Sequence, residues 1–489
     1  MDVYGATTGG FPRDAHTRGV EREQEVRAVV ASVLGIDASH AHAGLEYQSI
    51  QQWDSLRHAA LMLALEKAFD VEISDNRMVE LSSVQSIIDF IEHHAGGQAS
   101  VAVPNDGKES SVAGEEPVHR GLSGIYFDRS RISRIDGEAG HLEYRGYSLH
   151  DLVGAASFED VCHLLVEGEL PTVQQHDELG RLLADARMAT PPEAIALARS
   201  MASVHPMEAL RTGVSFLGSM QDRLADDDTR GMRDAGLRLL AQVPVLVAAH
   251  HCARRGMELR IPGVGTPFTA ALLHMLSGRM PDDLSVAMMD RDLIVHAEHS
   301  SNASAFTARV VIGCRAGVHA AITAAIAAFS GNLHGGAAEE VMKLVDEVGR
   351  PERAAAYVEA CFASGKPVMG FGHRVYRTED PRVRHLRDAA WRVSRESGDT
   401  SAFETIQAVV DAMRPYARHG VEANVDLYSG LLYRKLGLPD DLAVPLFVVS
   451  RMAGWLAQVM EQMENNVLIR PLLKYTGERG RRLEIGVRG

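Results

Sequence analysis

Apolar residues recur with helical spacing in three stretches near the N-terminus. The first runs from Glu23 to Leu34, the second from Asp54 to Phe69 and the third from Val84 to His93. Apolar side chains spaced three and four residues apart form one buried face, and Asp54 is a residue type that caps helices. The pattern predicts a small bundle of three main helices within residues 21–95, with a short helical turn near Met78.

The remainder of the chain, residues 119–489, also has a mainly helical pattern. Long periodic stretches cover Met232–Ala253 and Pro445–Gln462, and a shorter one covers Pro281–Asp290. Strand-like alternation is confined to Ile125–Ile135 and Leu142–Tyr144. We therefore predict an all-α fold class for both parts of the chain.

Two segments without periodicity bracket the small unit. Residues 1–20 are rich in Gly, Thr and Arg, and residues 96–118 in Gly, Ser, Ala, Pro and Glu. Such compositions are typical of disordered tails and flexible linkers. The predicted organisation is a disordered tail (1–20), a small helical domain (21–95), a flexible linker (96–118) and a large domain (119–489).

Charge and composition exclude several classes of function. The 489 residues carry a formal net charge of -15 and contain no run of five or more Lys or Arg, so we expect binding to neither nucleic acid nor anionic membrane. The most apolar stretch, Ala316–Ser330, is shorter than the ~20 residues of a membrane span. Residues 1–20 lack the apolar core of a secretory signal, and the four cysteines are far apart, as in a reduced cytoplasmic protein.

Ser55 is the first candidate for chemistry. It stands at the start of a predicted helix, where free amide groups and the helix dipole favour an anion. The surrounding unit is acidic, with 13 Asp and Glu against five Lys and Arg in residues 21–95. This unit, with its stretch WDSLRHAALMLALEKAFDVEIS, resembles the acyl carrier protein family. The resemblance implies a 4′-phosphopantetheine arm on Ser55, attached by a phosphopantetheinyl transferase. The alternative is a capped helix in an interaction module that is never modified.

Polar clusters interrupt the helices of the large domain. The first contains His296 and His299, which at a spacing of three are expected to share a helix face. Their spacing does not match the zinc-binding His-Glu-x-x-His pattern, so no metal is expected, and the plain alternative is a pair of satisfied core histidines. The other candidates lie further along the chain: His334, His373, Arg382, Asp426, Arg451 and Arg470.

Together these residue types suit one reaction. Making a carbon nucleophile from a thioester needs a base, and an Asp in an apolar setting tends to have a raised pKa. Donors must stabilise the forming enol oxygen and polarise the ketone that is attacked. If the ketone belongs to a dicarboxylate, arginines hold it best. One Asp, several His and a set of Arg supply these functions.

Residues 119–489 resemble the citrate synthase family from end to end. The resemblance begins at Gly121-Leu122, includes Tyr144-Arg145-Gly146-Tyr147 and Gly168-Glu169-Leu170-Pro171-Thr172, and contains every cluster above in order. It implies an all-α homodimer with a small domain inserted at about 336–441. The active site would lie between the two domains and close on binding, without a metal.

The resemblance also implies a role for each residue. Asp426 would be the base on the acyl thioester, His334 would stabilise the enol, and His373 would polarise the ketone of oxaloacetate. The remaining residues would hold the substrate carboxylates, the last one from the partner subunit: His299, Arg382, Arg451 and Arg470. Many members of the family have His-Ala-Asp-His-Glu where this chain has His296-Ala297-Glu298-His299-Ser300, which puts the fit of the substrate in question.

The fused carrier domain leaves the acyl donor open. Ser55 could carry it, since a flexible linker of 23 residues has an r.m.s. span of roughly 25–29 Å and tethering can give an effective concentration in the ~mM range. The alternative is an enzyme that uses acetyl-CoA or propionyl-CoA to make citrate or 2-methylcitrate. A different class is a catalytically silent scaffold or a carrier with a structural large domain, which the intact set of His334, His373, Asp426 and arginines disfavours.

Overall fold

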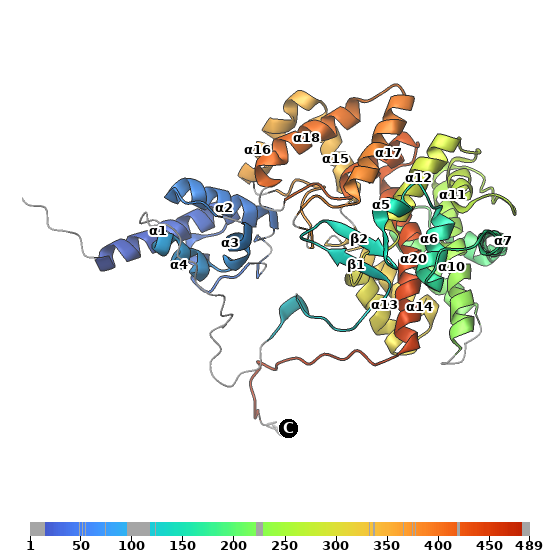
Figure 1. The fold of residues 1–489 in the computed structure, drawn as a ribbon, viewed down its shortest axis with the longest axis horizontal. Coiled ribbons are helices and arrows are strands. Elements are labelled where there is room, and N and C mark those ends of the chain that lie inside the picture. The colour runs from blue at the N-terminus through green and yellow to red at the C-terminus, as the bar shows by residue number, and fades with distance from the viewer. Residues whose placement is uncertain are drawn as a thin grey trace, which may run out of the picture.

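The computed structural model describes residues 15–47, 49–50, 52–53, 55–73, 75–94, 118–122, 124–221, 228–331, 333–335, 338–364, 366–373, 375–376, 378–417 and 421–481. Helices dominate these ranges, and the strands within them are few and short (Figure 1). The predicted all-α class is confirmed.

The N-terminal helices form a bundle with an apolar core of its own, which we call the N-terminal bundle (residues 15–94). Trp53, Leu61 and Ile87 are fully buried in this core. The predicted helices and the turn near Met78 are present. The helices are α1 (Ala15–Leu34), α2 (Ser55–Phe69), α3 (Asp75–Glu80) and α4 (Val84–His94).

Helix α1 begins eight residues before the predicted start at Glu23. It takes in residues 15–20, which the sequence assigned to the disordered tail, so the expectation of an unstructured segment up to residue 20 is wrong. The segment AHTRG has no apolar face that could signal a helix. Once the packed part of a helix has formed, further residues can extend it at little cost in free energy. Such residues need no apolar spacing in the sequence.

A small antiparallel sheet opens the rest of the described chain, which we call the C-terminal body (residues 118–481). Ser133 pairs with Tyr144, and the strands are β1 (Ser133–Asp136), β2 (His141–Tyr144) and β3 (Tyr147–Ser148). Residues 125–132 of the alternating stretch therefore form no strand. Ile125 and Tyr126 are exposed with no neighbouring strand, and alternation along a surface segment forms no sheet without a pairing partner.

Helix α20 (Ala443–Glu464) runs through the centre of the C-terminal body and packs against helices on several sides (Figure 1). The stretch Asp440–Glu464 is long and apolar enough to cross a membrane, but its most apolar window is wholly buried inside the protein, as in a core helix. The surrounding helices are α5 (Leu149–Leu152), α6 (Phe158–Glu167), α7 (Val173–Met188), α8 (Pro192–Ser200), α9 (Pro206–Ser219), α10 (Thr229–Arg255), α11 (Phe268–Ser277), α12 (Asp283–His296), α13 (Ala303–Gly313) and α14 (Val318–Phe329).

Five further helices pack mainly on one another and make up the α15–α19 group. They are α15 (Ala338–Val348), α16 (Ala354–Ser364), α17 (Val383–Glu396), α18 (Ser401–Ala417) and α19 (Asp426–Lys435). The group contacts the central helices through α12 with α17 and α15 with α20. Its extent resembles the small domain predicted at 336–441, a boundary that stays a prediction.

Candidate active site

His299 lies in a break between two helices. Helix α12 ends at His296, Ser300 has a left-handed backbone with φ of 50°, and Asn302 caps α13 by accepting from the Ser304 and Ala305 amides. The expectation that His296 and His299 share a helix face is therefore wrong. The cause is local, because a strong N-cap at Asn302 starts a new helix and a left-handed residue reverses the chain before it.

His373 is held in one tautomer by the backbone after it. Its Nδ1 accepts from the amides of Val375 at 3.0 Å and Tyr376 at 3.1 Å. The ring proton of the neutral form therefore sits on Nε2. Burial, assisted by the positive charge of Arg382, lowers the pKa of His373 to about 4. At neutral pH His373 is an uncharged donor through Nε2.

Arg382 is fixed beside His373 by a buried carboxylate. Its Nε and Nη2 donate to the two oxygens of Asp380 at 2.9 and 2.6 Å, and its Nη2 lies 3.5 Å from His373 Nε2. Burial opposes charge on both partners, but the Arg382 guanidinium holds the pKa of Asp380 below its usual range. This two-pronged pair fixes the orientation of the guanidinium.

His299 completes a cluster of three rings with His373 and Tyr376. Its Nε2 lies 3.3 Å from the Tyr376 hydroxyl, and its ring centre lies 5.2 Å from that of His373. Burial, and then the charge of Arg382, lowers the pKa of His299 well below its ordinary value. A neutral His299 next to a fixed cation suits the recognition of an anion.

His334 faces the N-terminus of α13. The Ser304 amide donates to His334 Nε2 at 3.3 Å, and the Ser304 hydroxyl lies 2.8 Å from the same nitrogen. Trp455 Nε1 in turn donates to the Ser304 hydroxyl oxygen at 3.1 Å. Because Nε2 accepts an amide hydrogen, the neutral ring carries its proton on Nδ1. His334 is thus set up to donate through Nδ1.

Asp426 is brought near His373 by a short antiparallel pairing. Phe371 bridges to Ala423, Asn424 N donates to Gly370 O at 2.9 Å, and the Asn424 side chain donates to Gly372 O at 3.1 Å. Asp426 follows as the first residue of α19. Burial raises the pKa of Asp426 to about 6, against the smaller opposing effects of His296 and Arg382. A carboxylate with a raised pKa is a stronger base than an exposed one.

Arg451 is fully buried in the middle of α20. Its Nε donates to the His296 carbonyl at 2.6 Å, and its guanidinium lies 5.0 Å from the ring centre of Phe447. Burial lowers its pKa to about 10, with the Glu298 carboxylate opposing. The positive charges of Arg451 and Arg382 both act on His299. Two buried guanidiniums near one neutral histidine suit the binding of a dicarboxylate.

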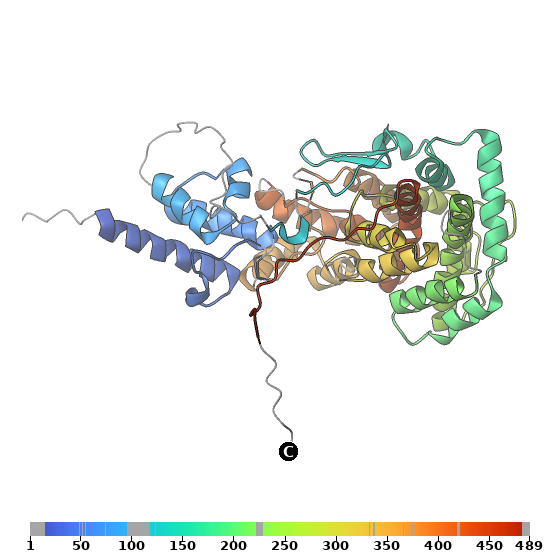
Figure 2. The same cartoon turned by 90° about the horizontal axis from the view of Figure 1, so that it is seen from below.

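Arg470 is the one predicted site residue of the C-terminal body that this single chain does not bring to the others. It is exposed in the segment that follows α20 and extends away from the body (Figure 2). The same segment exposes Leu472, Leu473 and Tyr475. That Arg470 acts from a partner subunit stays a prediction.

Ser55 is the first residue of α2, as the sequence predicts, while Asp54 lies outside the described residues. A helix of 15 residues begins here, so its first amide groups have no partner within the helix. A phosphodiester at this position would meet these amides and the positive end of the helix dipole. The position fits a 4′-phosphopantetheine arm on this ground.

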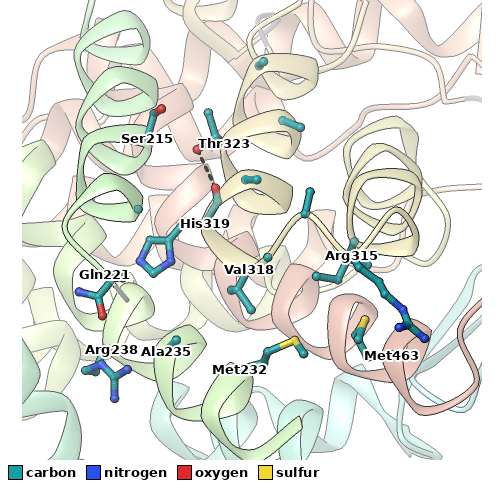
Figure 3. Close-up of a pocket in the computed structure, with 17 residues that line it drawn as sticks. Ser215, Gln221, Met232, Ala235, Arg238, Arg315, Val318, His319, Thr323 and Met463 are labelled. Carbon is teal, nitrogen blue, oxygen red and sulfur yellow. Dashed lines mark hydrogen bonds between the residues drawn. The ribbon is translucent and has the colours of Figure 1, made fainter. Parts of the chain in front are cut away.

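A cavity of the C-terminal body lies elsewhere. It has a volume of about 730 Å³ and lies between α9, α10 and α14, where His319, Arg238 and Val318 are among the lining residues (Figure 3). None of the predicted site residues lines it. Within the described residues, no three His, Cys, Asp or Glu are grouped so as to hold a metal.

Several residues of the site were not singled out from the sequence. Tyr376 lies three residues after His373 and Asp380 lies two residues before Arg382, but neither was given a role. Ser304 and Trp455 carried no signal, because a Ser at a helix start and a Trp in an apolar helix are ordinary in any fold. Only the folded chain brings Ser304 to His334 and Trp455 to Ser304.

Comparisons with known proteins agree on both parts of the chain. The family profile described as "Citrate synthase, C-terminal domain" matches residues 121–472, and that described as "Phosphopantetheine attachment site" matches residues 24–91. A citrate synthase of Synechocystis is 38% identical over 364 residues, which cover 74% of this chain and 92% of the relative. A 2-methylcitrate synthase of Corynebacterium glutamicum is 39% identical, covering 76% and 98%. The crystal structure of citrate synthase from Pyrobaculum aerophilum, 32% identical, superposes with a TM-score of 0.71 over 79% of this chain and 98% of that chain.

Proposed function

Because the chain belongs to the citrate synthase family, we propose that its buried His–Arg–Asp cluster condenses an acyl thioester with oxaloacetate. The observation that supports this proposal is that a base and two donors are each held in a suitable form: Asp426 has a raised pKa, His373 can donate through Nε2 and His334 can donate through Nδ1. Each is held in the form that the reaction needs before any substrate binds.

The first step makes the nucleophile. The Asp426 carboxylate takes a proton from the carbon next to the thioester carbonyl, and the electron pair moves to the carbonyl oxygen. His334 donates from Nδ1 to that oxygen as charge develops on it. The result is an enolate that His334 stabilises by its hydrogen bond, with Asp426 protonated. The contacts of His334 Nε2 with Ser304 fix the ring, so the donor needs no reorganisation during the step.

The second step forms the carbon–carbon bond. Arg382, Arg451 and His299 would hold the carboxylates of oxaloacetate, and His373 Nε2–H would polarise its ketone. The enolate carbon attacks the ketone carbon, and the ketone oxygen takes a proton from His373 as it becomes a hydroxyl. A water molecule then returns a proton to His373 as its oxygen attacks the thioester carbonyl, and the departing sulfur takes the proton held by Asp426. The products are the free thiol and the tricarboxylic acid.

For the acyl donor we propose a thioester on Ser55. The bound arm would supply a terminal thiol that carries the acyl group. A phosphopantetheine attachment domain lies on the same chain, joined through residues 96–118. A tether of that length keeps the donor within reach and raises its effective concentration. A modifying phosphopantetheinyl transferase is then required as a partner.

The donor could instead be propionyl-CoA. Relatives named 2-methylcitrate synthase are as similar to this chain, at 39% identity, as those named citrate synthase. The donor assay below separates the two, because arm-bound and CoA-bound acyl groups are supplied separately.

We also propose a homodimer. Helix α14 is strongly apolar, yet Ala320 and Ala327 on it are exposed along the cavity of Figure 3. The exposed Leu472 and Leu473 near Arg470 likewise lack cover in one chain. A second copy that covers these surfaces would remove apolar area from water and could supply Arg470 to the first copy's site.

The test uses the full-length protein loaded with coenzyme A or acyl-CoA by a broad-specificity phosphopantetheinyl transferase. Intact mass should show one arm that Ser55→Ala abolishes. With oxaloacetate, loss of the acyl mass from the arm supports a carrier-bound donor, and thiol release from free acetyl- or propionyl-CoA supports a CoA donor. Both activities should disappear in Asp426→Asn. Absence of turnover with every donor would refute the proposed function.

A further inference from the structure

One residue of the N-terminal bundle does not belong to the bundle's own core. Ala59 on α2 is fully buried, but it packs into the apolar cluster of the C-terminal body. Its neighbours Leu61, Met62 and Leu65 face the bundle core instead. Helix α2 therefore has two buried faces, one within the bundle and one against the rest of the chain.

The outer buried face begins one helical turn after Ser55. Ser55 is the first residue of α2, and Ala59 follows it four residues later in the same helix. In both views the N-terminal bundle lies beside α16 and α18 of the α15–α19 group (Figures 1 and 2). Phe362 near the end of α16 stacks on Tyr416 near the end of α18, with ring centres 4.0 Å apart.

Charge favours the same arrangement. The bundle is acidic, whereas residues 366–396, which run from just after α16 to the end of α17, contain eight Lys and Arg against four Asp and Glu. This segment also contains His373 and Arg382 of the proposed site. Opposite net charges attract the two units before contact and orient them. Because Ala59 has only a methyl side chain, α2 can approach the C-terminal body closely.

We propose that the α2 face bearing Ala59, one turn after Ser55, is a docking surface for the α16–α18 side of the same chain, so that the acyl arm starts close to its own active site. The burial of Ala59 against the C-terminal body supports the surface itself. Its use in turnover rests on the proposed carrier-bound donor. Docking converts a random search by the tethered bundle into a short reach by the arm.

The test compares Ala59→Arg with Gln85→Arg in the full-length, acyl-loaded protein. Gln85 is exposed on α4, so this control introduces the same arginine side chain away from the docking surface. Arg at position 59 would place a charge in a dry contact, which costs free energy unless the units separate. We expect loss of acyl mass from the arm with oxaloacetate to slow at least tenfold in Ala59→Arg and to be unchanged in Gln85→Arg.

Two controls locate the effect. Loading of the arm should be unchanged in both variants, which shows that the bundle is folded. Because Ala59 lies on α2 and is not part of the proposed active site, turnover of free acyl-CoA should be unchanged as well. An Ala59→Arg protein that empties its arm at the wild-type rate would overturn the docking surface and leave the proposed function intact.

Hydrogen exchange covers the case in which the arm-bound acyl group is never used. In wild-type full-length protein, amides of α16 and α18 near the docking surface should be protected, and Ala59→Arg should remove that protection while Gln85→Arg does not. Protection without arm turnover would keep the docking surface and refute the carrier-bound donor. Equal exchange in all three proteins would overturn the docking surface.

Discussion

At the scale of single residues, burial moves the pKa values of two groups in the site away from their ordinary values. Asp426 has a raised pKa because its surroundings are dry, and His373 has a lowered pKa for the same reason. Burial thus produces a carboxylate that accepts a proton readily and a histidine that stays neutral. Arg382 and Asp380 neutralise each other beside them, and Arg451 adds a second buried positive charge.

The pKa of Asp426 predicts the acid side of the pH profile. The base must be ionised, so kcat/KM should fall as pH decreases through about 6, by about tenfold per unit below it. His373, with a pKa of about 4, should remain neutral and add no second limb above pH 5. Steady-state rates from pH 4.5 to 8.5 check this. An acid limb centred near 4 would mean that Asp426 is not the base or is not desolvated.

Tyr376→Phe should weaken the binding of oxaloacetate. The variant removes the hydroxyl 3.3 Å from His299 Nε2 and leaves that buried nitrogen without this partner. A neutral hydrogen bond contributes about 0.5–1.5 kcal/mol, so KM for oxaloacetate should rise about two- to tenfold with kcat little changed. Tyr357→Phe is the control, since its hydroxyl contacts Glu347 on α15. An unchanged KM would remove Tyr376 from the binding site.

At the scale of elements, the position of the base depends on one bridge between two loops. The pairing of Phe371 with Ala423 carries His373 on one segment and leads into Asp426 on the other. Helix ends supply the remaining geometry, because α12 stops before His299 and α13 starts at the amide that binds His334. The catalytic residues are thus positioned by breaks between helices.

Gly370→Ala should damage catalysis more than Gly372→Ala. Both glycines have positive φ, at 86° and 85°, so each alanine is strained. A Cβ at Gly370 would also lie 2.7 Å from Leu427 Cδ1, whereas nothing lies within 4 Å at Gly372. The collision would push α19 and Asp426 away from His373, and kcat should fall about 100-fold. Equal losses in the two variants would show that backbone strain alone matters.

The elements show how far the sequence alone reaches. Periodicity placed α2, α4, α10 and α20 closely, because each buries a long apolar face. It missed the first turns of α1, whose sequence has no apolar spacing, and the break after His296, which depends on Ser300 and Asn302. Residue types and the resemblance brought out His334, His373 and Asp426. Tyr376 and Ser304 were missed because their roles arise from contacts across 77 and 30 residues of sequence.

At the scale of the whole molecule, one chain contains a carrier unit and a condensing unit but exposes Arg470. The exposed tail and the open face of α14 are surfaces for a second copy under the proposed dimer. Such a dimer would have two sites, each completed by its neighbour, and two carrier units. The full catalytic unit would then be the dimer.

Mixing two inactive variants tests that arrangement. Arg470→Ala and Asp426→Ala should each be severely impaired alone. If Arg470 acts on the partner's site, a mixed dimer contains one complete site, and an equal mixture exchanged by refolding should recover about a quarter of wild-type activity. Recovery is measured with oxaloacetate and the best donor. No recovery, with mixed dimers verified by mass, would place Arg470 outside the partner's site.

The central claim is that Asp426, His334 and His373 condense an acyl thioester with oxaloacetate. The most direct measurement is the mass of the product formed by purified full-length protein from oxaloacetate and acyl groups of increasing length, supplied on Ser55 and on coenzyme A. The account predicts one tricarboxylic acid per thioester consumed, with none formed by Asp426→Asn. Thioester loss without a condensed product, or product formation that survives Asp426→Asn, would contradict it.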